Sequence, residues 1–194
     1  MMQISVCKLT PALLDDWLSY FDHDAFSDHD DWCGCYCMCY HWDSELQKKR
    51  AWNCDRECAA LNRKQAIDFI KSGRMQGYLA YVDGKVVGWC NSNNKKAYRN
   101  VNFNFAEEVP DNGEKIKSIV CFSVAPEFRG RGVATAVLAY VCNDAKAEGF
   151  DLIEAYPFEH NENHAYHGPL SLYTKNGFQK CLQIEGCVVC RKTL

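Results

Sequence analysis

The run from Val124 to Thr135, Val-Ala-Pro-Glu-Phe-Arg-Gly-Arg-Gly-Val-Ala-Thr, constrains the fold of this chain more than any other segment. The preceding residues, 118–124, are rich in β-branched and aromatic side chains and predict a strand. Pro126 ends that strand because proline cannot donate to a ladder. Apolar residues at helical spacing from Ala134 to Ala145 predict a helix directly afterwards. The run therefore predicts a short junction between a strand and a helix.

This junction has the features of an anion site. Gly130 and Gly132 fall at the expected helix N-terminus, where unpaired N–H groups and the positive end of the helix dipole favour an anion. Glycine lets the backbone approach a ligand closely, and Arg129 and Arg131 add positive charge. Pyrophosphate is the anion that such a loop is suited to hold.

Known phosphate-binding loops differ from one another in spacing. A P-loop needs Gly-x-x-x-x-Gly-Lys-Ser/Thr, which this sequence lacks. A dinucleotide fingerprint needs a third glycine where Thr135 stands, and it usually opens its domain. An ordinary strand-to-helix turn with solvated arginines is the structural alternative, and this run alone leaves it open.

The pattern Arg/Gln-x-x-Gly-x-Gly/Ala, matched by Arg129, Gly132 and Ala134, resembles the acetyl-CoA loop of the GNAT superfamily of N-acetyltransferases. A second segment, Leu-Tyr-Thr-Lys-Asn-Gly-Phe at 172–178, is similar to another signature of that superfamily, in the same order along the chain. The resemblance is strongest over residues 76–194 and weaker over residues 1–75.

The resemblance implies an α+β fold in which a central twisted mixed sheet of about seven strands is flanked by helices. One domain is expected over residues 1–194, because no repeat or linker divides the chain. The sequence pattern predicts helices at 11–21, 59–72 and 134–145, and a loop over 91–113. It predicts strands at 4–9, 77–82, 85–90, 118–124, 151–156, 178–184 and 188–192.

Acetyl-CoA is the cosubstrate that the resemblance implies. Its pantetheine arm would pair with backbone groups of Phe122, Ser123 and Val124. Its pyrophosphate would lie on the backbone of Arg129, Gly130, Arg131, Gly132, Val133, Ala134 and Thr135.

Two residues are expected to move protons. Tyr173 matches the tyrosine of the superfamily that protonates the coenzyme A thiolate, with a core aromatic as the structural alternative. Glu154 lies in an apolar strand and is the candidate general base, because burial raises the pKa of a carboxylate toward neutrality. An outward-facing position or a structural pair with a lysine is the alternative for Glu154. His160, His164 and His167 are further candidates for the base.

The chain departs from the superfamily before the tyrosine. Relatives often carry an asparagine where Tyr166 stands, and the loop over residues 157–168 is long. Contacts of that asparagine with coenzyme A are therefore not expected here, and the loop is a candidate for shaping an acceptor pocket.

A cysteine-rich segment follows the first predicted helix, with Cys33, Cys35, Cys37 and Cys39 at alternate positions before His41. In a strand, alternate residues lie ~6.6 Å apart, whereas sulfurs that share a zinc ion lie within about 4 Å of each other. No metal site is expected from a straight strand. A curled metal site, reactive redox thiols and a packed thiol-lined wall remain the alternatives.

The superfamily commonly uses the region after the first helix to select the acceptor, which here is the cysteine- and aromatic-rich segment 22–58. Its aromatic side chains could surround a cationic or hydrophobic amine. The expected acceptor pocket consists of Trp32, Tyr36, Tyr40 and His167.

Composition excludes several other classes of protein. The 194 residues carry a net charge of −3 and no basic run beyond Lys48–Arg50, which argues against nucleic-acid binding. No apolar stretch approaches the ~18 residues of a membrane span, and residues 1–9 lack the pattern of a signal peptide. With 13 cysteines, an odd number, most thiols are expected to be reduced in a cytoplasmic protein.

The predicted function is acetyl transfer from acetyl-CoA to a primary amine, that of a small molecule, directly within a ternary complex. Acidic residues over 15–31 favour a cationic acceptor. The protein is expected to be a monomer or a homodimer. The alternative from another class is a thiol-based metal or redox sensor on a GNAT-like scaffold.

Overall fold

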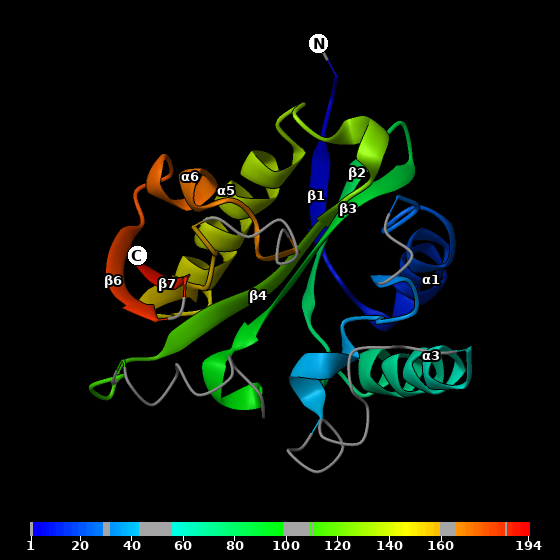
Figure 1. Ribbon diagram of the computed structural model, residues 1–194, viewed down its shortest axis with the longest axis horizontal. Coiled ribbons are helices and arrows are strands. Elements are labelled where there is room, and N and C mark those ends of the chain that lie inside the picture. Colours follow the sequence, from blue (N-terminus) through cyan, green and yellow to red (C-terminus); the bar gives the residue numbers. More distant parts are fainter. Residues whose placement is uncertain are drawn as a thin grey trace.

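A seven-stranded mixed sheet, in the order β1-β2-β3-β4-β5-β7-β6, organises the computed structural model (Figure 1). The structure describes residues 2–28, 32–42, 56–98, 109, 111–159, 166–184 and 186–194. The strands are β1 (Ser5–Lys8), β2 (Gly77–Val82), β3 (Lys85–Asn94), β4 (Ile116–Val124), β5 (Leu152–Ala155), β6 (Gln179–Ile184) and β7 (Cys187–Thr193). The α+β fold with about seven strands is confirmed.

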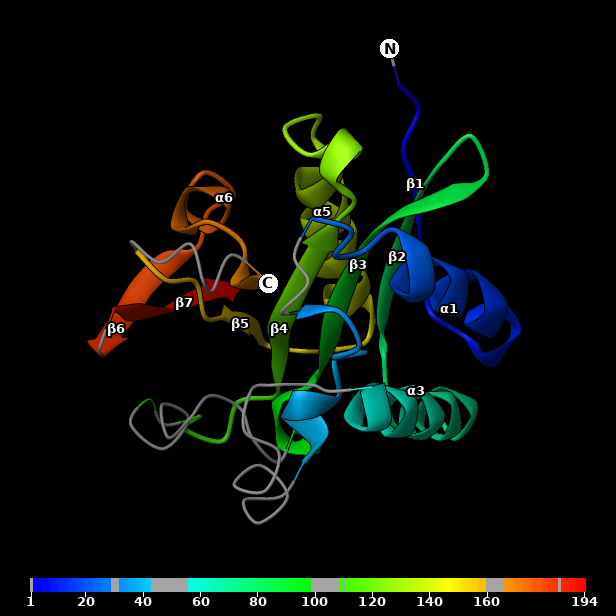
Figure 2. The ribbon, with the colours of Figure 1, turned by 45° about the vertical axis from the view of Figure 1, so that its right-hand side comes forward.

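Helices cover both faces of the sheet (Figures 1 and 2). On one face, α1 (Leu14–His23) and α3 (Arg56–Lys71) pack against side chains such as Leu79 and Trp89. On the other face, α5 (Val133–Ala147) and α6 (Leu170–Thr174) pack against Tyr78, Cys90 and their neighbours. Successive strand residues point to opposite faces, so β2 and β3 contribute to both cores. None of the helices that the structure describes is long and apolar enough to cross a membrane.

The parallel pairing of β4 with β5 is short. It joins Ile116–Ile119 to Leu152–Ala155 and ends there, although β4 continues to Val124. On its other side, β4 pairs with β3, but Val120 is left without a partner between Ile119 and Cys121. Such a bulge bends a strand and disrupts its ladder. Figure 2 shows β5 diverging from β4 beyond this point.

As a result, residues 121–124 of β4 have a neighbour strand on the β3 side alone, within the part of the chain that the structure describes. Their main-chain groups on the β5 side form what we call the open edge.

The observed elements differ from the predicted ones at one point that matters for the site. The polar residues 91–94, predicted as part of a loop, extend β3 and pair with β4 from Cys121 to Lys117. Asn91 and Ser92 are fully buried there. Polarity predicted a loop, but pairing with a neighbouring strand satisfies the backbone and outweighs that preference.

Candidate active site

The loop predicted to hold an anion runs directly from the open edge into α5. A short 3-10 turn (Pro126–Phe128) follows β4, and residues 129–132 are exposed before α5 begins at Val133. Gly130 and Gly132 have φ values of +72° and +86°, a conformation that favours glycine. A Cβ atom at either position would meet nothing within 4 Å, so the space in front of the loop is open.

The first N–H groups of α5 point into this space. The bond from the Ala136 N–H to the Gly132 carbonyl, 3.0 Å long, is the first of the helix, so the N–H groups of residues 133–135 precede it. We call residues 129–135 the cofactor loop. Its geometry fits a pyrophosphate group.

The side chains of the open edge are held on the two faces of the sheet. The Phe122 ring packs against Tyr173 on the α5 side, with ring centroids 6.4 Å apart. On the α1 side, the Ser123 hydroxyl donates to the Ala25 carbonyl at 3.1 Å and lies 3.0 Å from the Tyr20 hydroxyl. The side chains of both residues are thus engaged with the protein. In the antiparallel ladder the Ala125 N–H bonds to Val87 of β3, so the main-chain groups of Ser123, two residues earlier, also face β3, and those of Phe122 and Val124 face the open edge.

Arg129 does not offer a free charge to the cofactor loop. Its Nε donates to the Val124 carbonyl at 3.0 Å, and its two terminal nitrogens bind the Asp28 carboxylate at 2.5 and 3.0 Å. The prediction that Arg129 adds charge to the anion site therefore needs revision, because a carboxylate neutralises it.

Tyr173 lies on α6 beside the open edge. It is fully buried between Phe122 and Phe178, and its hydroxyl donates to the backbone carbonyl of His167 at 2.6 Å. Burial raises the pKa of Tyr173 well above its usual value. The phenol therefore keeps its proton at neutral pH, as a proton donor must.

Glu154, the predicted base, is fully buried on β5 and surrounded by donors. Its carboxylate pairs with the Lys95 ammonium at 2.8 Å and with the Arg191 guanidinium at 2.6 Å. The Tyr156 hydroxyl donates to it at 2.5 Å, so the Ser118 hydroxyl, 2.9 Å from that of Tyr156, donates in turn to Tyr156.

The two cations balance the charge of this carboxylate and occupy both of its oxygens. This arrangement fits the structural alternative for Glu154, a pair with a lysine, better than the role of base. Lys95 and Arg191 were not anticipated, because they lie far from Glu154 in the sequence and only the sheet brings them together.

The residues of the expected acceptor pocket meet around Tyr166. The Tyr166 ring lies 5.3 Å from that of Trp32 and 4.6 Å from that of His167, and the His167 ring lies 6.3 Å from that of Tyr40. We call Trp32, Tyr40, Tyr166 and His167 the aromatic cluster. Tyr166 was recognised in the sequence only as a departure from the superfamily, yet it is the centre of this cluster.

Tyr36 lies elsewhere. Its ring stacks on Phe21 of α1 with centroids 5.8 Å apart, and its hydroxyl donates to Asp22 at 2.6 Å. Residue 36 has a φ of 43° in a turn, which directs its side chain toward α1. The ring contacts described for Tyr36 are thus with Trp17 and Phe21 of α1. His160 and His164 lie outside the described residues.

The cysteine-rich segment forms turns and a 3-10 helix (Met38–His41) instead of a strand. Cys37 is buried against Cys121 of β4, and the Trp89 indole donates to its sulfur at 3.3 Å. Burial raises the pKa of the Cys37 thiol well above its usual value, and the pKa of Cys39 is raised for the same reason.

No group of three cysteine, histidine or acidic side chains in the described residues could hold a metal ion. Buried thiols with raised pKa values are poor nucleophiles. The segment therefore fits a packed thiol-lined wall, and neither a metal site nor reactive redox thiols gains support.

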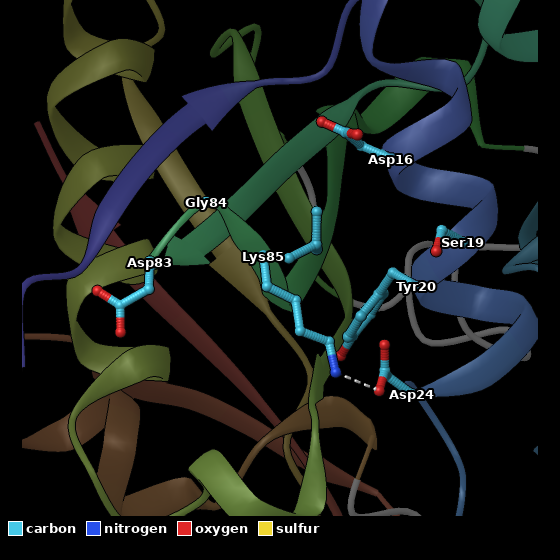
Figure 3. A pocket seen from close by; sticks show the side chains of 8 residues that line it. Asp16, Ser19, Tyr20, Asp24, Asp83, Gly84 and Lys85 are labelled. Atoms are coloured by element: carbon cyan, nitrogen blue, oxygen red, sulfur yellow. Dashed lines mark hydrogen bonds and ion pairs between the residues drawn. The ribbon is translucent and has the colours of Figure 1, made fainter.

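Two of the acidic residues that favoured a cationic acceptor pair with cations on the outer surface. Asp22 pairs with Arg63 at 2.9 Å and Asp24 pairs with Lys85 at 2.7 Å. The latter pair lines a hollow of about 310 Å³ between α1 and the β2–β3 turn, from which Asp83 points away (Figure 3). These carboxylates therefore do not support a preference for a polycationic acceptor.

Comparisons with known proteins agree with this geometry. Residues 37–178 match the model of the acetyltransferase (GNAT) family. No curated protein matches the sequence. Among solved structures, the chain is similar to a PaiA N-acetyltransferase from Thermoplasma acidophilum in complex with coenzyme A, with 14% identity, full coverage of both chains and a TM-score of 0.58.

Two further structures have a TM-score of 0.60. One is a GNAT-family acetyltransferase from Listeria monocytogenes, with 13% identity over 100% of this chain and 96% of that one. The other is a mosquito arylalkylamine N-acetyltransferase like 5b, with 12% identity over 99% of this chain and 100% of that one. At these identities the likeness shows the fold alone.

The Glu154 network leads to a prediction about stability. We expect Glu154→Gln to lower the free energy of unfolding by about 3 kcal/mol, because it leaves two buried cations without a counter-charge. Denaturant unfolding measures this change. The matched control is Asp111→Asn, which removes an exposed pair with Lys96 at 3.9 Å and should change stability by less than about 0.5 kcal/mol.

A catalytic base would behave differently. Unchanged stability together with loss of the acidic limb of the pH profile of kcat/KM would contradict the structural role of Glu154 and restore it as the base.

The thiols lead to a second prediction. At pH 8, iodoacetamide should modify the exposed Cys33 and Cys181 at least about tenfold faster than the buried Cys37 and Cys121, because burial blocks access and disfavours the thiolate. Peptide mass spectrometry measures the rates, and protein unfolded in urea is the control in which they converge. Fast modification of folded Cys37 would instead favour a thiol-based sensor.

Proposed function

Because the chain belongs to the GNAT family of acetyltransferases, we propose that it is an acetyl-CoA-dependent N-acetyltransferase that acts on the primary amine of a small molecule. The observation that carries this proposal is the open edge of β4, which leads without interruption into the cofactor loop and passes beside the Tyr173 ring. Acetyl-CoA supplies an acetyl thioester, whose thiolate needs a proton when it leaves.

The main chain would hold and orient the cosubstrate. The N–H groups of Phe122 and Val124 and the Phe122 carbonyl face the open edge and are placed to pair with the amides of an extended arm, as in the addition of a strand to a sheet edge. The Val124 carbonyl already accepts the Arg129 Nε. The N–H groups of the cofactor loop, at the N-terminus of α5, are placed to bind the pyrophosphate. The contacts predicted for Phe122, Ser123 and Val124 are made by main-chain groups. Substitution of their side chains would therefore alter these contacts little.

Tyr173 is the proposed proton donor. Its hydroxyl proton now rests in a hydrogen bond to the His167 carbonyl, 2.6 Å away, and would be redirected to the leaving sulfur. Removal of this hydroxyl leaves the ring packing with Phe122 and Phe178 intact.

Direct transfer to the amine is favoured over an acetylated cysteine. Cys121 lies next to Phe122 on the open edge of β4. Its contact with Cys37 lowers its pKa, but burial among other thiols raises it further, so the pKa lies above the usual value. The thiol is therefore protonated at neutral pH and is a poor nucleophile.

The acceptor would lie against the aromatic cluster. Trp32 and Tyr166 are half-buried, so their rings can contact the apolar part of an amine. On β5, the carboxylate of Glu154 is already paired with two cations, Lys95 and Arg191. This arrangement does not favour a second positive charge on the acceptor. We therefore propose a monoamine with an apolar or aromatic body in place of a polyamine.

The function is tested by acetyl transfer to an amine panel, followed by mass spectrometry of coenzyme A and product. We expect Tyr173→Phe to lower kcat by about 100-fold while the KM for acetyl-CoA changes little, because the loss of a general acid affects the transition state. The matched control is Tyr78→Phe, which removes the hydroxyl of another buried tyrosine, bonded to Asp144 at 2.6 Å and away from the open edge.

An unchanged kcat in Tyr173→Phe would exclude this residue as the donor. Failure of the wild-type protein both to bind coenzyme A and to acetylate any amine would contradict the proposed function.

A further inference from the structure

The segment that follows α1, residues 24–28, is attached to both parts of the proposed acetyl-CoA site. Its Ala25 carbonyl accepts the Ser123 hydroxyl of the open edge, and this directs the Tyr20 hydroxyl to donate to Ser123. Its Asp28 carboxylate binds Arg129 of the cofactor loop through two hydrogen bonds. The segment is therefore positioned by the strand and the loop that would hold the cosubstrate.

The same segment leads into the aromatic cluster. Phe26 packs edge-on against Trp32, with centroids 5.8 Å apart, and Trp32 packs edge-on against Tyr166. Tyr166 contacts His167, whose backbone carbonyl accepts the Tyr173 hydroxyl. Contacts thus run without a gap from the cofactor loop to the proposed proton donor.

The chemistry of the Arg129 side chain indicates its role. Its two terminal nitrogens bind Asp28 and its Nε donates to the Val124 carbonyl. The guanidinium therefore connects the end of β4 to the 24–28 segment. The two-bond geometry adds direction to the contact, which a lysine could not reproduce. The N–H groups of the cofactor loop and the Arg131 side chain remain for the pyrophosphate.

Resting on the proposed function, we propose that Arg129 and Asp28 form a clamp that couples acetyl-CoA binding to the acceptor side of the site. In this clamp Arg129 is a positioning residue and not a pyrophosphate ligand. Pyrophosphate immobilises the cofactor loop, the loop holds Asp28 through Arg129, and the 24–28 segment then fixes Trp32. By linkage, the amine binds more tightly when acetyl-CoA is in place.

The size of the effect follows from exposure. The side chains of Arg129 and Asp28 are 42% and 39% exposed, so the pair contributes modestly. We expect loss of the pair to change the KM for the amine, and the protection of amides by coenzyme A, by about three- to fivefold.

The first experiment uses coenzyme A as the probe. Calorimetry should give Asp28→Asn a Kd for coenzyme A within about twofold of the wild-type value or tighter, because the loop N–H groups remain and a negative charge is removed. Coenzyme A should slow hydrogen exchange of the amides of residues 25–28 and 32–38 in the wild type. In Asp28→Asn, the factor by which coenzyme A slows this exchange should be about three- to fivefold smaller.

The matched control is Asp24→Asn. It removes the carboxylate that pairs with Lys85 at 2.7 Å in the same segment but leaves the clamp intact, so it should behave as the wild type. Asp28→Glu, which restores a carboxylate, should recover most of the protection.

Kinetics with an amine accepted in the panel provide the second readout. Asp28→Asn and Arg129→Lys should each raise the KM for the amine about three- to fivefold and leave the KM for acetyl-CoA nearly unchanged. The double variant should add nothing to either single one, because both break the same contact.

Three outcomes would overturn the clamp. Equal coenzyme A-dependent protection in Asp28→Asn and the wild type would exclude the coupling. A Kd for coenzyme A raised about tenfold in Arg129→Lys would make Arg129 a pyrophosphate ligand. If the wild-type protein itself fails to bind coenzyme A, the proposed function falls and the clamp falls with it, whereas the first two outcomes leave the proposed function standing.

Discussion

The divergence of β4 from β5 is the constraint on which the rest of the structure depends. The pairing with β5 ends at Ile119, next to the bulge at Val120, and residues 121–124 of β4 have no neighbour strand on that side within the described part of the chain. Unpaired main-chain groups inside a protein need partners. An extended ligand arm with its own amides can provide them, which explains why the open edge leads directly into a loop suited to an anion. The proposed binding sites for the arm and for the pyrophosphate would then follow one another along the chain.

Around this opening, charged side chains serve mainly to hold segments together. Glu154 joins β5 to Lys95 and to Arg191 of β7, and Arg129 joins the cofactor loop to Asp28. Each contact links parts of the chain that are distant in sequence. The Glu154 pairs are buried and the Arg129–Asp28 pair is partly exposed, and each fixes the position of one segment relative to another. In the proposed function, the groups assigned to acetyl transfer are backbone N–H groups and the hydroxyl of Tyr173.

Local signals in the sequence predicted much of this arrangement. The glycine-bearing run from Gly130 to Thr135 indicated an anion loop, because the conformation of glycine and the N-terminus of a helix are local properties. The spacing of apolar residues predicted the strands and helices on both sides of it. The prediction was wrong for residues 91–94, whose polarity indicates a loop but whose pairing partner is a distant strand. It also placed Tyr36 in the acceptor pocket, although a left-handed turn directs that side chain to α1.

The sequence by itself determined the family, the mixed sheet and the position of the cofactor loop, because each of these is encoded in short runs of neighbouring residues. Only the tertiary structure decided which side chains meet. Glu154 is neutralised by two cations, Asp22 and Asp24 pair with Arg63 and Lys85, and Tyr166 contacts Trp32 and His167. Contacts of this kind depend on how segments far apart in the chain pack together, and the charge and accessibility of a side chain are set by those neighbours.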